Sequence, residues 1–187
     1  SEPSVNAVAV PNGSAFNITL LSGERVTVLF SGAGQAFWDR NAGLITLRNT
    51  TAASSLRITA LDVTLTNLRV LGNNNAALGS GTVDGTMRGS SAFYLDGAVN
   101  SATFGTIDAT GTFGSGGDMQ SLTAASITAG QIRARDLRQL TVAGAFGTTS
   151  SDSELSLQVV DLGAVTIGGV FAANISSDRE IDGFTAG

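Results

Sequence analysis

The sequence predicts an all-β protein, a parallel β-solenoid (β-helix) that follows an N-terminal hairpin or cap region. Three observations lead to this prediction: helix-forming residues are scarce, apolar and polar residues alternate in short runs, and one glycine-centred pattern recurs. The 187 residues include 24 glycines and no lysine, and each glycine inside a helix costs about 1 kcal/mol. Alternation with a period of two is typical of β-strands. A β-sandwich, in which the same glycines only mark turns, is the alternative fold.

The N-terminal peptide, residues 1–10, contains an apolar stretch that is typical of a strand. Val5, Val8 and Val10 lie in this stretch, and the turn-forming sequence Pro11-Asn12-Gly13 follows it. A terminal strand can pair within its own chain, or it can be exchanged between subunits as an added strand. We therefore take Val5, Val8 and Val10 as candidate assembly residues and leave both arrangements open.

Residues 11–67 are predicted to form an N-terminal β region or cap. Apolar and polar residues alternate over residues 16–20 and again over residues 26–30, with Ser22-Gly23-Glu24 between the two runs. Two such runs joined by a short glycine-containing turn predict a β-hairpin. Shorter strands are expected at residues 45–47, 56–60 and 63–65.

Residues 68–187 are predicted to contain the solenoid repeats. The pattern runs apolar, any, apolar or small, any, glycine, any, apolar, and Val165–Phe171 is its clearest late copy. Irregular spacing of the copies fits a coil whose turns carry insertions, and units of roughly twenty residues are typical of solenoids. Each unit is too small to bury its apolar side alone, so the units must stack. The copies begin at Gly81, Phe93, Ile107, Ser126, Leu140 and Val165.

Stacked copies would form two ladders of inward-facing side chains, because alternate residues of a strand share one face. The column of glycines between the ladders would leave room for a bend or for close backbone approach. The first ladder is predicted to contain Val83, Leu95, Ala109, Val142 and Ile167. The second ladder is predicted to contain Met87, Val99, Phe113, Ile132, Phe146 and Phe171.

Two late segments, residues 137–146 and 162–171, resemble the β-strand repeats of bacterial surface and secreted proteins of the parallel β-helix type. Those repeats are imperfect and rich in Gly, Ser and Thr. The resemblance covers approximately residues 68–187 and implies a structural or adhesive role. It transfers no catalytic or binding residue to this chain.

The composition removes most catalytic chemistry. The chain has no cysteine and no histidine, and all ten of its basic residues are arginine. It therefore lacks the thiolate, the imidazole and the lysine amine, which are the commonest nucleophiles, general bases and metal ligands. We predict that the protein is not an enzyme and has no catalytic residue, cofactor or metal. The net charge of −5 argues against a nucleic-acid partner, and no apolar run is long enough for a membrane span.

Three groups of residues could still bind a ligand, and each also has a purely structural interpretation. Asp84 and Asp96 precede the glycine in two copies of the pattern, so they could stack as a glycosidase acid pair or a cation site, or simply mark Asp-Gly turns. Trp38 could be a platform for a sugar, or a core or cap residue. The arginines of residues 133–138 could bind a carboxylated sugar or an acidic partner surface, or form a solvated face.

The low charge and the richness in Ser, Thr, Asn and Gly predict an extracellular or cell-surface protein, and we expect any signal peptide to have been removed ahead of Ser1. Sequons at Asn12, Asn17, Asn49 and Asn174 permit N-glycosylation.

The predicted function follows from the architecture, because the open ends of a solenoid favour further strand pairing. We predict a structural subunit of an extracellular or cell-surface fibre or layer that self-assembles through β-strand contacts. Its predicted partners are copies of itself in a homo-polymer, together with surface glycans. The alternative is an adhesin, or a carbohydrate-binding or carbohydrate-cleaving β-helix protein.

Overall fold

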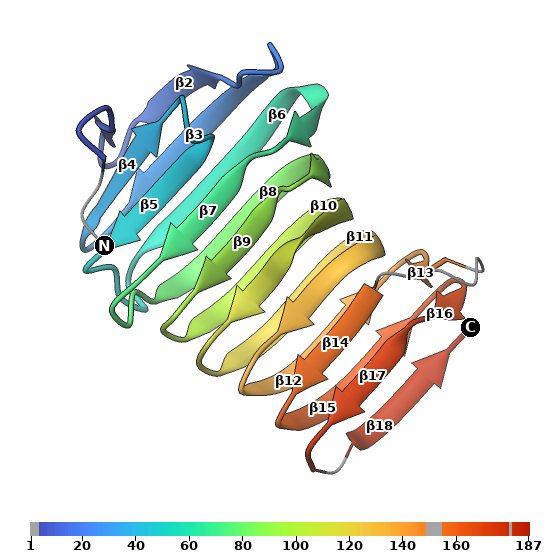
Figure 1. The fold of residues 1–187 in the computed structure, drawn as a ribbon. Coiled ribbons are helices and arrows are strands. Elements are labelled where there is room, and N and C mark those ends of the chain that lie inside the picture. The colour runs from blue at the N-terminus through green and yellow to red at the C-terminus, as the bar shows by residue number, and fades with distance from the viewer. Residues whose placement is uncertain (1–3, 149–154, 180) are drawn as a thin grey trace.

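The chain winds into a β-solenoid of about six turns, with 69% of its residues in strands. The computed structural model describes residues 4–148, 155–179 and 181–187, and it contains no helix within them. The coils follow one another from the N-terminal strands at one end to the C-terminal strands at the other (Figure 1). The predicted all-β solenoid is confirmed. The β-sandwich alternative is wrong, because neighbouring coils pair in parallel.

The described residues form 18 strands, most of them short and separated by tight corners. In chain order they are β1 (Val8–Val10), β2 (Ala15–Thr19), β3 (Arg25–Ser31), β4 (Gln35–Asp39), β5 (Leu44–Arg48), β6 (Ser55–Thr66), β7 (Arg69–Gly72), β8 (Leu78–Gly89), β9 (Ala92–Leu95), β10 (Val99–Ser115), β11 (Met119–Arg133), β12 (Asp136–Val142), β13 (Phe146–Gly147), β14 (Leu155–Val159), β15 (Asp161–Ile167), β16 (Phe171–Ala172), β17 (Asn174–Ser177) and β18 (Ile181–Ala186).

The N-terminal strands pair antiparallel and close that end of the solenoid. β2 and β3 form the predicted hairpin, with Ile18 opposite Val26. Gly23 has a φ of +92° in the connecting turn, a conformation that glycine adopts without steric cost. β1 pairs with β4, and β4 pairs with β5. β1 therefore pairs within its own chain, which is one of the two arrangements that the sequence left open.

Parallel strands then stack in two main sheets. The first starts at β6, whose other edge pairs antiparallel with β3 of the hairpin, and continues in parallel through β8, β10, β11, β12 and β15 to β18. The second continues from β5 through β7, β9, the later parts of β10 and β11, and β14 to β17. Parallel pairing starts with β5 at Leu44, ahead of residue 68, where the sequence pattern placed the first repeat.

The first predicted ladder is correct for three of its members. Val142 lies directly opposite Ile167, and Val83 belongs to the same column. Leu95 lies opposite Ser115 and Ala109 opposite Gly89, so neither stands in this column. The pattern copies that begin at residues 81 and 93 are too close in sequence to lie one coil apart, and they occupy different sides of the same coil. The complete first column is Phe16, Val28, Ile58, Val83, Phe104, Ala124, Val142, Ile167 and Ala186.

The second predicted ladder divides among several columns for the same reason. Phe146 lies opposite Phe171, as predicted, and Met87 stands in their column. Val99 belongs to a different column. Phe113 and Ile132 lie opposite each other in a column of the second sheet. This second column contains Val8, Trp38, Ile45, Val70, Phe93, Phe113, Ile132, Leu157 and Ile175.

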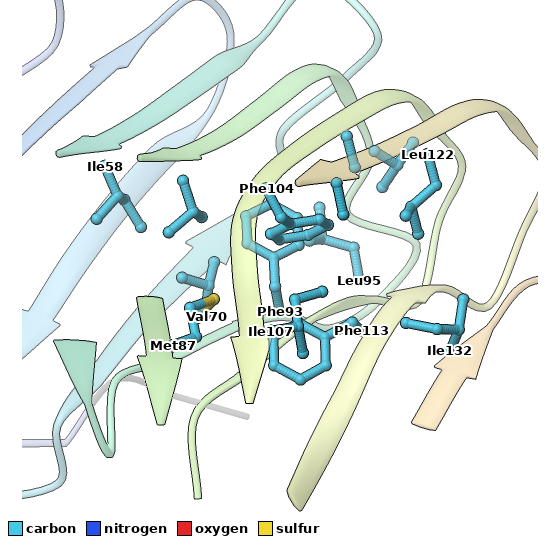
Figure 2. Packing of buried hydrophobic residues seen from close by; sticks show 14 of the residues in the cluster. Ile58, Val70, Met87, Phe93, Leu95, Phe104, Ile107, Phe113, Leu122 and Ile132 are labelled. Atoms are coloured by element: carbon cyan, nitrogen blue, oxygen red, sulfur yellow. The ribbon is translucent and has the colours of Figure 1, made fainter. Parts of the chain in front are cut away.

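One continuous apolar core fills the solenoid from Val10 near the N-terminal end to Ile167 near the C-terminal end. At its centre Phe104 contacts Phe93 and Phe113 edge to face, with ring centroids 5.5 and 5.7 Å apart (Figure 2). These rings come from both sheets, so each coil buries apolar area that belongs to its neighbours. The coils depend on one another for stability, as expected of a stacked repeat.

Candidate assembly surface at the C-terminal coil

The last coil, made of β16, β17 and β18, is open on its outer side. These strands pair with β13, β14 and β15 of the preceding coil. No strand within the described residues pairs with their other edges. An unpaired strand edge presents a row of backbone N–H and C=O groups that favours pairing with another strand.

Apolar side chains that are buried in the preceding coil are exposed in this one. Phe184 is 44% exposed, whereas its partner Val165 in the preceding coil is only 2% exposed. Ile181 is 39% exposed and its partner Leu162 only 1%. In the last coil, therefore, the inward positions that form the core elsewhere are exposed to water.

Three aromatic rings organise this open end. Phe171 stacks on Phe146 with ring centroids 5.9 Å apart and an interplanar angle of 15°. Phe184 meets Phe171 edge to face, with centroids 5.0 Å apart. Aromatic pairs of this kind are worth about 0.5–1.5 kcal/mol beyond their buried area. The end surface is thus a packed apolar layer.

The N-terminal end differs, because its inward residues are mostly covered. Val10, Ile18 and Trp38 are buried where β1 and β2 close over the core. Trp38 is only 5% exposed, so the structure places it in the core and rules out a sugar-stacking surface for it. Of the candidate assembly residues, Val5 is fully exposed and Val8 is half-exposed beside Trp38.

Asp84 and Asp96 do not form a carboxylate pair. Asp84 lies in β8 and makes an ion pair with Arg57 of β6, at 2.7 Å. Asp96 lies in the corner that follows β9, where its backbone N–H donates to the carbonyl oxygen of Gly72. The two residues occupy different sides of one coil, so they cannot act as the acid pair of a glycosidase.

Ion pairs between neighbouring coils are a feature that the sequence analysis missed. Arg57–Asp84 is one of five among the described residues, and each of them joins an arginine of one coil to an aspartate of a neighbouring coil. Their sequence separations vary from 17 residues for Arg135–Asp118 to 37 for Arg25–Asp62, so no fixed interval in the sequence signalled them. The other four are Arg25–Asp62, Arg88–Asp108, Arg135–Asp118 and Arg179–Asp161.

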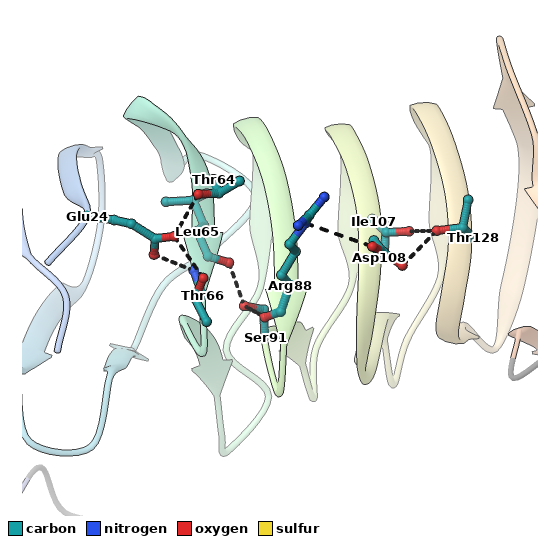
Figure 3. Close-up of polar contacts among 9 residues, drawn as sticks. All are labelled: Glu24, Thr64, Leu65, Thr66, Arg88, Ser91, Ile107, Asp108 and Thr128. Atoms are coloured by element: carbon teal, nitrogen blue, oxygen red, sulfur yellow. Dashed lines mark hydrogen bonds and ion pairs between the residues drawn. The ribbon is translucent and has the colours of Figure 1, made fainter. Parts of the chain in front are cut away.

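A series of polar contacts follows one corner of the solenoid (Figure 3). Glu24, in the hairpin turn, accepts hydrogen bonds from the hydroxyls of Thr64 and Thr66, both at 2.7 Å. Burial acts to raise the pKa of Glu24, but hydrogen bonds from Thr64, Ser22 and Thr66 outweigh it and hold the pKa below its ordinary value. Two coils further on, in β10, Asp108 accepts a hydrogen bond from Thr128 at 3.0 Å. These contacts link the cap to the first coil and the later coils to each other.

A shallow cleft of about 400 Å³ lies on the outer side of the second sheet, near one corner. Tyr94, Gly114, Arg133 and Gln158 are successive members of one outward-facing column there. Gly114 has no side chain, so a gap separates Tyr94 from Arg133. Among the described residues Arg133 makes no ion pair, whereas the adjacent Arg135 is bound by Asp118.

The arginine cluster of residues 133–138 is divided between two places. Arg133 and Arg135 line the cleft, but Arg138 lies on the first sheet beside Asp161 and Asp182. Hydrogen bonding to Arg135 lowers the pKa of Asp118 below its ordinary value. Only Arg133 is therefore a candidate ligand-binding cation in the cleft.

The four sequon asparagines are all exposed. Asn12 donates from its side-chain amide to the carbonyl oxygen of Gly32 at 2.7 Å. The side-chain oxygen of Asn17 accepts a hydrogen bond from Thr27. A glycan on Asn12 would modify the amide nitrogen that makes this contact, whereas one on Asn17 would leave the accepting oxygen in place. No side-chain contact of this kind is seen for Asn174 in the described part of the chain.

Comparisons with family models, with curated proteins and with solved structures found no match. Among residues 4–148, 155–179 and 181–187, no helix is long and apolar enough to cross a membrane. The same residues contain no group of three or more acidic side chains placed to hold a metal ion.

Proposed function

We propose that the protein is a structural subunit of an extracellular or cell-surface fibre or layer, which self-assembles through β-strand contacts at the ends of its solenoid. The observation that carries this proposal is the open C-terminal coil, where an unpaired strand edge coincides with exposed inward residues. The resemblance of residues 68–187 to bacterial surface and secreted repeats supports the extracellular setting. The lack of histidine, cysteine and lysine supports a role without catalysis.

Exposed apolar area at the open end provides a driving force for association. Complete burial of a Phe or Ile side chain contributes about 1.5–3 kcal/mol. Phe184, Ile181 and Phe171 each retain about two-fifths of their accessible surface, so covering them would contribute roughly 1 kcal/mol per residue. Continued strand pairing would add backbone hydrogen bonds to this apolar contact.

Light scattering after size exclusion, together with negative-stain microscopy, tests the proposal on the 187-residue chain. We expect a mass that grows with concentration for the unmodified chain. F184D and I181D should each remain monomeric, because both place a carboxylate in the contact. T103D is the matched control, since Thr103 is exposed on the first sheet away from the ends. Circular dichroism shows whether each variant is folded. A monomer at every concentration, or unchanged assemblies in both end variants, would contradict the proposal.

The cleft at Tyr94 and Arg133 favours a second candidate function, the binding of acidic glycans. An aromatic ring and an unpaired guanidinium on either side of a gap suit a sugar ring that carries a carboxylate. R133A should abolish binding on a glycan array, and R138A makes the same charge change outside the cleft. Equal binding by the two variants, or none by the unmodified chain, would rule out this candidate.

A further inference from the structure

The edge strands at the two ends of the solenoid run in the same direction. β2 is antiparallel to β3, and β3 is antiparallel to β6. The two reversals cancel, so β2 runs parallel to β6 and to every later strand of the first sheet, including β18. In the second sheet β1 is antiparallel to β4 and β4 to β5, so β1 runs parallel to β17. In each sheet, therefore, the edge strand at the N-terminal end runs in the same direction as the edge strand at the C-terminal end.

The edge strands also match in length and in the columns that they terminate. β18 has six residues and β2 has five, while β17 has four and β1 has three. The first column begins at Phe16 and ends at Ala186, a large residue at one end and a small one at the other. The second column begins at Val8 and ends at Ile175. Translation along the solenoid axis would thus continue both columns with apolar contacts.

We infer that the C-terminal coil binds the N-terminal edge of a second copy of this chain, with β18 parallel to β2 and β17 parallel to β1. The inference rests on the proposed self-assembly and specifies its partner and its polarity. Ala186 of one copy then lies against Phe16 of the next, and Ile175 against Val8. Because each copy keeps an open C-terminal coil, this head-to-tail contact does not close and builds a fibre.

Charge favours this arrangement over contact between two C-terminal ends. The last coil carries exposed carboxylates at Asp178 and Asp182. Arg179 between them is paired with Asp161 of the preceding coil at 3.3 Å, so two such ends would present like charges to each other. β1 and β2 contain no charged residue. Beside β2 and β4 there is also a hollow of about 350 Å³ that Phe16, Trp38 and Arg40 help to line. An apolar edge beside one arginine is the better partner for an apolar coil that carries carboxylates.

Disulfide trapping tests the polarity, because the chain has no native cysteine. Thr185 ends an outward-facing column that begins at Ala15, and both residues are exposed. In the proposed contact they occupy neighbouring parallel strands, about 4.8 Å apart, within the range that a disulfide spans. Chains carrying A15C and chains carrying T185C, one of them with a mass tag, are mixed and oxidised.

We expect a disulfide-linked product that contains one chain of each kind and forms only in the mixture. T103C mixed with A15C is the control and should give no such product, because Thr103 lies in the middle of the first sheet. T185C dimers in place of the mixed product would overturn the head-to-tail polarity but leave self-assembly standing. Assemblies seen by light scattering without any mixed product would also overturn it. Monomers throughout would contradict the proposed function itself.

Discussion

The carboxylate of Asp62 accepts two hydrogen bonds from the guanidinium of Arg25, at 2.7 and 3.2 Å, and a third from the Arg25 backbone N–H at 2.8 Å. Arg25 begins β3 in the hairpin, and Asp62 lies in β6 of the first coil. The pair therefore joins the N-terminal cap to the solenoid. Equivalent arginine–aspartate pairs join later coils, so this contact is one instance of a general device of the fold.

Acid should loosen the cap through this contact. Hydrogen bonds from the side chain and then the backbone of Arg25 lower the pKa of Asp62 from 3.8 to about 2. Because the folded-state pKa is depressed, the contribution to stability is complete above pH 3.8 and is lost as the pH falls towards 2. The urea midpoint should therefore fall over this interval by less in D62N than in the unmodified chain. D96N, at an exposed corner, is the control and should follow the unmodified chain. Identical acid profiles for D62N and the unmodified chain would contradict the assignment.

The aromatic centre of the core should dominate stability. Phe113 is fully buried and contacts Phe104 edge to face. F113A should lower the free energy of unfolding by about 3–5 kcal/mol, through lost burial and the cavity left behind. T103A, on the outward side of the same strand, should change it by less than about 0.5 kcal/mol. Urea unfolding followed by circular dichroism measures both variants, and equal effects would show that the two sheets do not share a core there.

The columns show how far sequence patterns reach in this fold. Val142 and Ile167 were placed together correctly, because the pattern copies that contain them lie one coil apart. The hairpin was likewise predicted correctly, from the alternation of apolar and polar residues between residues 16 and 30. Leu95 and Ala109 were misplaced, because a seven-residue pattern recurs on more than one side of a coil. A local pattern of this kind identifies inward positions without saying which side of the coil they face.

The ion pairs and the cleft could not be predicted, because they depend on register. Between Thr59 and Thr64 the chain of β6 bulges relative to β8, and Val63 there has a φ of +73°. Such bulges change the sequence interval between neighbouring coils, so no fixed period connects Arg57 with Asp84. The open ends were expected from the general nature of solenoids. The direction of the strands at the N-terminal end, however, could be known only from the structure, which shows how β1 and β2 pair.

Gly114 should be intolerant of any side chain. Its φ is +133°, and a Cβ at this position would overlap the carbonyl oxygen of Arg133 in the next coil. G114A should therefore destabilise the solenoid by more than about 1 kcal/mol, because both the backbone conformation and the strand spacing oppose it. G183A is the matched control, since its Cβ would have no atom within 4 Å. Thermal unfolding compares the two variants, and an unchanged melting temperature for G114A would contradict the prediction.

Removal of residues 1–10 should uncover Trp38 without unfolding the coils. β1 pairs with β4 along one edge only, and Trp38 lies directly opposite Val8 in that pairing. Trp38 is the only tryptophan in the chain, so its fluorescence reports this site alone. We expect a red-shifted emission and easier quenching by acrylamide in the truncated chain, with an unchanged β-sheet signal in circular dichroism. V5A is the control, because Val5 is fully exposed and its change should leave the emission as it is.

The truncated chain should also stop assembling, because it lacks the edge that receives β17. An unshifted emission would mean that β1 does not cover Trp38, and fibres that persist after truncation would mean that β1 is not part of the contact.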